Sequence, residues 1–145
     1  MWNKLVDIFS PEIKEDSLTA DHAIAAVLVR AARTDNEYTL SEKNLIDHLL
    51  SIQLGLDLEE AKILRRKAEE LENKINDNVQ LTRVIKKDIS YEDRQEIVEQ
   101  LWRIVLDDNT RTPEENKFMR VLTHLLGIND VNSARARLKI LNQKK

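Results

Sequence analysis

The stretch of sequence that decides the fold is residues 24–49, which read IAAVLVRAARTDNEYTLSEKNLIDHL. Its apolar residues recur every three or four positions on each side of a polar segment, residues 35–42, and do not alternate as they would in a half-buried strand. This spacing places the apolar side chains on one face of a helix. The stretch therefore predicts two amphipathic helices joined by a polar turn, and we call residues 35–42 the first corner.

A second stretch repeats this pattern further along the chain. Residues 97–122 read IVEQLWRIVLDDNTRTPEENKFMRVL and are identical to residues 24–49 at eight of the 26 aligned positions. The identities include leucines of the apolar face as well as acids of the polar turn, as where Asp35 aligns with Asp108. We interpret the match as a duplicated helix–corner–helix unit. The two halves lie around residues 20–55 and 93–128, and the second corner is residues 108–115.

Apolar residues at helical spacing also occupy the rest of the chain. They predict seven helices after a short one at the N-terminus, with apolar stripes within residues 23–31, 45–50, 61–75, 81–85, 97–105, 118–125 and 131–141. The only two glycines, Gly55 and Gly127, follow two of these stripes, where Gly can end a helix in the left-handed conformation. No segment has the composition of a flexible linker. We therefore expect one all-α domain over residues 1–145, a bundle of about seven to eight helices.

Composition excludes several classes of protein. The chain has 145 residues, no Cys and no apolar run as long as a bilayer requires, which excludes disulfide frameworks, thiolate metal sites and transmembrane segments. Its first residues, MWNKLVDIF, lack the apolar core and the cleavage site of a secretory signal. We therefore expect a cytoplasmic protein.

Local helix chemistry explains part of each corner. A Thr in each corner predicts a helix N-cap, and a Glu three residues later completes a capping box: Thr39 with Glu42, and Thr112 with Glu115. An Asn ahead of each cap can end the preceding helix in the left-handed conformation. These residues therefore need no functional explanation.

Asp35 and Asp108 do need a further explanation, because an acid in the last turn of a helix faces the negative end of the macrodipole. One alternative is structural: the carboxylate accepts nearby backbone N–H groups, or it is neutralised by an arginine, with candidates Arg30, Arg33, Arg103 and Arg111. The other is a divalent cation, since carboxylates and carbonyls are the oxygen ligands that Ca²⁺ and Mg²⁺ prefer. An EF-hand is excluded, because neither corner has the Gly and the Glu that its twelve-residue loop requires.

The sequence offers little support for catalysis. His22, His48 and His124 lie on separate predicted helices without the spacing of a zinc-binding HExxH motif, and no Cys is present to act as a nucleophile. We therefore expect a non-catalytic interaction module whose corner acids bind a divalent cation or a basic partner. The alternative is a metal-dependent hydrolase that uses the same acids.

The Ala-rich residues 23–32, the two acidic corners and the segment from Ile97 to Val105 together resemble the tellurite-resistance TerB family, in particular its small stand-alone bacterial members. The resemblance covers nearly the whole chain. It implies a compact helical module linked in bacteria to tellurite resistance and envelope stress. It also implies a site for a divalent cation, calcium or magnesium, and the matching candidate ligands are Asp35, Glu37, Glu42, Asp108 and Glu115.

The corners depart from the family pattern in two respects. Asn36 and Asn109 replace the usual Gly, and Thr110 replaces the second acid of its corner. The second corner is therefore the weaker candidate for a metal site, unless Asp107 substitutes for the missing acid.

The two ends of the chain bear on its partners. Residues 131–145 carry five basic residues and no acid, but they lack interleaved aromatics, so we expect no nucleic-acid partner. In the short N-terminal helix, apolar residues fall on one face: Trp2, Leu5, Val6 and Phe9. We favour packing of this face on the bundle, with a subunit contact or shallow membrane contact as alternatives. We expect a protein partner of unknown identity and leave homo-oligomer formation open.

Overall fold

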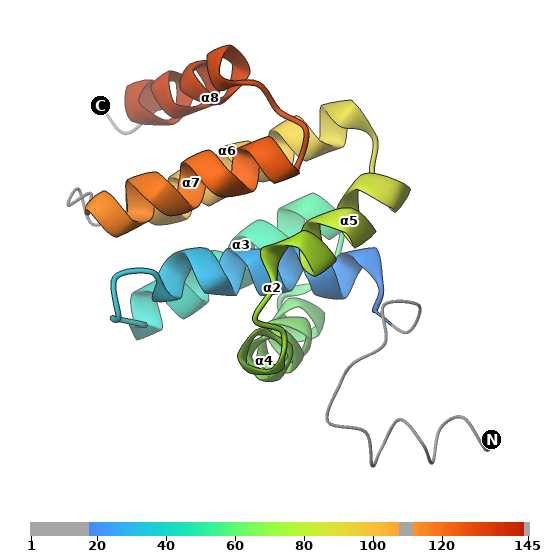
Figure 1. Cartoon of the computed structure of the whole chain (residues 1–145). Helices are drawn as coiled ribbons and strands as arrows, with labels where there is room; N and C mark the ends of the chain where they lie inside the picture. The colour runs from blue at the N-terminus through green and yellow to red at the C-terminus, as the bar shows by residue number, and fades with distance from the viewer. Residues whose placement is uncertain (1–17, 108–111, 144–145) are drawn as a thin grey trace.

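The computed structural model describes residues 18–107 and 112–143. These residues form seven helices and no strand: α2 (Ala20–Arg33), α3 (Leu40–Leu54), α4 (Leu58–Lys74), α5 (Asn78–Asp88), α6 (Tyr91–Val105), α7 (Pro113–Leu125) and α8 (Asp130–Gln143). The expected all-α fold and the seven expected helices are confirmed (Figure 1). The predicted N-terminal helix lies outside the described residues. No described helix has both the length and the apolar content to cross a membrane.

Helix α2 lies at the centre of the bundle because most of it is apolar. Nine of its 14 residues are buried, five of them alanines, and it packs against α3, α4, α5 and α6. Small side chains at a helix contact allow a short distance between the two axes. In Figure 1, α4 is seen end-on below α2 while α2 runs across the view, so these two helices cross steeply.

Helix α6 joins this core to an outer layer. It packs against α2 and also against α7 and α8. Trp102 on α6 is buried, and its indole N–H donates to Ser133 Oγ on α8 at 3.2 Å. In Figure 1, α8 lies outermost and runs back along α7 in the opposite direction.

The helix ends follow the local signals in the sequence. Thr39, Asp57 and Thr112 each form a capping box with a Glu three residues later. Gly55 and Gly127 have φ angles of 68° and 78°, as their expected role at helix ends requires. Short-range chemistry therefore decides where these helices begin and end.

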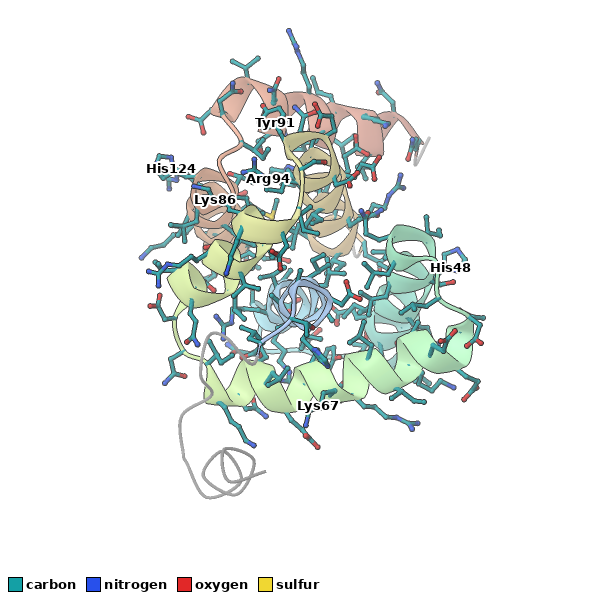
Figure 2. All side chains as sticks on the ribbon, turned by 90° about the vertical axis from the view of Figure 1, so that its right-hand side faces the viewer. His48, Lys67, Lys86, Tyr91, Arg94 and His124 are labelled. Carbon is teal, nitrogen blue, oxygen red and sulfur yellow. The ribbon has the colours of Figure 1, made fainter. Side chains whose placement is uncertain are left out.

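The end of α7 is also held by a side chain from α6. Arg94 Nη1 donates to the Leu126 carbonyl at 2.6 Å, which satisfies one of the carbonyls left open at a helix C-terminus. A Cβ on Gly127 would lie 2.9 Å from this Nη1 and 3.7 Å from Lys86 Cε. Figure 2 shows Lys86 and Arg94 together at this end of α7, near His124. Gly127 is thus favoured by its φ angle and by the lack of space for a side chain.

The second helix of each proposed half starts with the same local motif. Helices α3 and α7 are each preceded by a Thr N-cap that forms a capping box with a Glu. Residues 108–111, which contain most of the turn in the second corner, lie outside the described residues. The internal duplication stays a prediction from the sequence.

Candidate functional site

The first corner reverses the chain between α2 and α3. Asn36 adopts the left-handed conformation with φ 65°, as the sequence predicts, and its N–H donates to the Arg33 carbonyl at 3.1 Å. The Asp35 carboxylate accepts the backbone N–H of Glu37 at 3.0 Å through Oδ1. This bond confirms that the Asp35 carboxylate has a local structural role, and it stabilises the turn.

The arginines beside Asp35 do not neutralise it. Arg30 Nη1 donates to Asn78 Oδ1 at 2.6 Å, and its Nη2 donates to the carbonyls of Glu72, at 3.0 Å, and Ile75. Arg33 Nη1 lies 3.1 Å from Glu72 Oε1 and donates to Asn73 at the same distance. The Arg30 guanidinium therefore joins α2 to α4 and α5, and the Arg33 guanidinium joins α2 to α4. Neither Asp35 nor Glu37 has an ion pair in the described part of the chain.

The glutamates at the helix starts are engaged in capping. Glu42 Oε1 accepts the backbone N–H of Thr39 at 3.0 Å. Glu115 Oε1 accepts the backbone N–H of Thr112 at 2.9 Å, and Glu115 is only 3% exposed. Asp108, the remaining candidate ligand, lies outside the described residues. Asp35, Glu37 and Glu42 thus lie in one corner of the chain, but the structure does not gather their side chains into one group, and Glu115 lies in the first turn of α7.

The acids of the first corner do not form a closed protein site for a metal in the described part of the chain. Within residues 18–107 and 112–143, no three His, Asp or Glu side chains are grouped as a metal site. Glu37 is exposed and Asp35 is partly exposed, so water can supply the remaining ligands. Mg²⁺ is usually held by one or two carboxylates and several waters, and Ca²⁺ also accepts water and carbonyl ligands.

A polar network behind the first corner was missed by the sequence analysis. Tyr38 lies within the corner, and its hydroxyl donates to Glu69 Oε2 on α4 at 2.6 Å. Arg65 donates from Nη1 to the same Glu69 oxygen at 2.8 Å and from Nε to Asp47 Oδ1 on α3 at 2.6 Å. The guanidinium of Arg33 lies 4.8 Å from the centre of the Tyr38 ring. This network ties the first corner to α3 and α4.

The network changes the ionisation of its members. Burial and the hydrogen bond to Glu69 raise the pKa of Tyr38 well above its usual value, although Arg65 and Arg33 act in the opposite direction. Burial also disfavours the charged form of Glu69. Hydrogen bonds from Tyr38 and Arg65, with the positive charges of Arg65 and Lys43, outweigh that effect and lower the pKa of Glu69. At neutral pH the phenol is therefore a neutral donor and Glu69 an ionised acceptor.

One signal in the sequence could have revealed the network. Arg65 lies four residues after Ala61 and three before Ala68, so it belongs to the buried stripe of α4. Asp47 likewise follows Ile46 and precedes Leu49 on the buried part of α3. Two opposite charges on the buried faces of consecutive helices predict an ion pair, because a buried charge without a partner is costly.

The described histidines do not form a catalytic group. His48 and His124 lie on opposite sides of the molecule in Figure 2. His22 Nδ1 is hydrogen-bonded to Thr19 at the start of α2. Within the described ranges no His is paired with a carboxylate.

A comparison with known protein families identifies the family of this chain. Residues 21–138 match the model of the family described as tellurite resistance protein TerB. The chain belongs to the TerB family. The match begins in α2 and ends in α8, so it contains both corners, and it confirms the resemblance inferred from the sequence. Neither the curated proteins nor the solved structures give a significant match to this TerB-family chain.

Proposed function

We propose that this TerB-family domain is a non-catalytic module of a bacterial stress or tellurite-resistance system, and that it binds Ca²⁺ or Mg²⁺ at the first corner. Family membership over residues 21–138 supports the general role. The observation that supports the cation site is the pair of acids Asp35 and Glu37, which have no cationic partner among the described residues although Arg30 and Arg33 are close in sequence.

The electrostatics of the first corner favour a cation. Asp35 follows the last turn of α2, where the open carbonyls already carry partial negative charge. The Glu37 carboxylate adds a second negative charge two residues later. A divalent cation would turn this repulsion into attraction, with Asp35 and Glu37 as carboxylate ligands and water completing the shell.

The other three candidate ligands take lesser parts in the proposal. Glu42 and Glu115 each use one oxygen for a capping box, so they would act chiefly by adding negative charge. Asp108 would supply the corresponding ligand of the second corner. We expect weaker binding there, because Thr110 stands where the first corner has Glu37.

The acidic first corner also suggests the chemistry of a partner. A basic segment of another protein could pair with Asp35 and Glu37 directly or compete with the cation for them. We therefore expect calcium to weaken binding of such a segment, and we expect no turnover of phosphoester substrates by the domain.

NMR titration with calcium and with magnesium at constant ionic strength tests the cation site. We expect saturable shifts of the backbone amides of residues 35–38 in the wild type and their loss in Asp35→Asn, whose side-chain oxygen can still accept the Glu37 N–H. Asp88→Asn is the matched control, because Asp88 is an exposed acid at the end of α5. If the wild type shows no saturable shift with either cation, or if Asp35→Asn binds as tightly as the wild type, the cation site is excluded.

A further inference from the structure

Three helices line an open pocket at the surface, formed by residues that are far from the first corner along the chain. It has a volume of about 300 Å³ and is formed by α6, α7 and α8. Trp102 lies at its base, since this side chain is only 7% exposed. Arg120 from α7 and Arg137 from α8 line the same pocket. Helices α7 and α8 run in opposite directions in Figure 1, and each contributes one arginine to the lining of the pocket.

The guanidinium groups of Arg120 and Arg137 have no partner among the described residues, unlike those of Arg30, Arg33 and Arg65. Arg30, Arg33 and Arg65 each donate to carboxylates or backbone carbonyls. In the described part of the chain, the side chains of Arg120 and Arg137 have no hydrogen bond and no ion pair. Asp130 is the only acid that lines the pocket, so its lining side chains carry a net positive charge.

The pocket also offers neutral hydrogen-bond donors. Ser133 Oγ accepts the indole N–H of Trp102 at 3.2 Å, which leaves the hydroxyl hydrogen of Ser133 to be donated. Ser133 is 7% exposed, so water does not compete for it as it would at an open surface. The Asn116 amide lines the pocket as well. Thr123 is different, because its hydroxyl donates to the Met119 carbonyl at 2.8 Å.

We propose that this pocket binds an oxyanion, a phosphate or a carboxylate group, between Arg120 and Arg137. Guanidinium groups bind planar carboxylates and phosphates through paired N–H donors. Ser133 and Asn116 supply further donors, and the Trp102 side chain forms part of the pocket lining. The anion relieves the repulsion between two like charges in one pocket. The site is independent of the cation site, since it shares no residue with the first corner.

The contrast with Arg94 supports this assignment. Arg94 and Lys86 form another basic group (Figure 2), but the Arg94 guanidinium already donates to the Leu126 carbonyl and caps α7. Its role there is structural. Arg120 and Arg137 have no comparable structural role among the described residues, so their positive charges remain for a ligand.

The test is an NMR titration of the full chain with inorganic phosphate and, separately, with acetate, each replacing chloride at constant ionic strength and pH. We expect saturable shifts of the Trp102 indole N–H and of the Arg120 and Arg137 Nε–H resonances with at least one anion. Shifts with phosphate alone identify a phosphate site, and shifts with both identify a site for oxyanions in general. The absence of saturable shifts with both anions overturns the proposal.

Three arginine variants distinguish an anion bound in the pocket from an anion attracted weakly to any basic surface. Arg120→Gln and Arg137→Gln should each weaken the anion about tenfold or more, since a charged hydrogen bond is lost. Arg135→Gln is the matched control, because Arg135 lies on α8 but does not line this pocket. Asp130→Asn should tighten binding by removing the repelling carboxylate. Equal weakening by all three arginine variants would show a nonspecific effect and overturn the proposal.

Discussion

Arg65 on α4 and Asp47 on α3 form an ion pair of 2.6 Å in which both side chains are more than nine-tenths buried. Arg65 has a second carboxylate partner, Glu69, at 2.8 Å, whereas Arg65 is the only side chain bonded to Asp47 among the described residues. The two members of the pair are therefore not equivalent, because removing Arg65 leaves Asp47 buried without a partner.

Arg65→Met should accordingly destabilise the domain by about 3–5 kcal/mol, the cost of an uncompensated buried charge. Asp47→Asn should cost less, since Glu69 still pairs with Arg65. Urea denaturation measures both changes. Glu99→Gln is the control, because it breaks a more exposed pair with Lys139 and should cost at most about 1 kcal/mol. Equal losses for Arg65→Met and Glu99→Gln would contradict the buried-pair account.

The raised pKa of Tyr38 predicts that the folded domain loses stability at alkaline pH. Its folded pKa is raised above the usual value of 10.0, so above pH 10 the unfolded chain releases the phenol proton while the folded chain retains it. The free energy of unfolding should then fall as pH rises above 10. Denaturation curves between neutral and alkaline pH should show this fall in the wild type and a smaller one in Tyr38→Phe. Tyr91→Phe serves as the control and should behave as the wild type does.

The two glycines at helix ends should respond differently to Ala. Both have positive φ angles, so each substitution should cost about 1–2 kcal/mol in backbone strain. A Cβ at position 55 meets nothing within 4 Å, whereas one at position 127 approaches Arg94 Nη1. Gly127→Ala should therefore cost about 1 kcal/mol more, through the weakened hydrogen bond to Leu126. In an Arg94→Met background the extra cost should disappear, and its persistence would refute this explanation.

Cation binding at the first corner should raise the thermal stability of the domain. With a chelator present, Asp35→Asn and Asp88→Asn should both be neutral or stabilising by about 0.3–1 kcal/mol, because each removes an acid from the negative end of a helix. With calcium or magnesium in hundredfold excess over the dissociation constant, the wild type and Asp88→Asn should gain about 2.7 kcal/mol. Melting curves in the three buffers measure this. If Asp35→Asn gains as much as the wild type, its carboxylate is not a ligand.

The sequence by itself determined the helices and their ends. The three-and-four spacing of apolar residues identified all seven described helices, and caps such as Thr39, Thr112 and Gly55 were recognisable because each acts on backbone groups within a few residues. The family resemblance rested on similarly local motifs and is confirmed by the match over residues 21–138. Interactions of this range are encoded in neighbouring residues and need no knowledge of how helices pack.

Only the tertiary structure decided which charges meet. Arg30 and Arg33 were near Asp35 in sequence, yet their guanidinium groups reach α4 and α5, because α4 crosses close to α2. Tyr38 and Glu69 are 31 residues apart and share a hydrogen bond. Arg120 and Arg137 line one pocket because α7 and α8 both pack against α6 and against each other. The packing of the helices decides which charged side chains become neighbours. That packing depends on the whole apolar core rather than on any local motif.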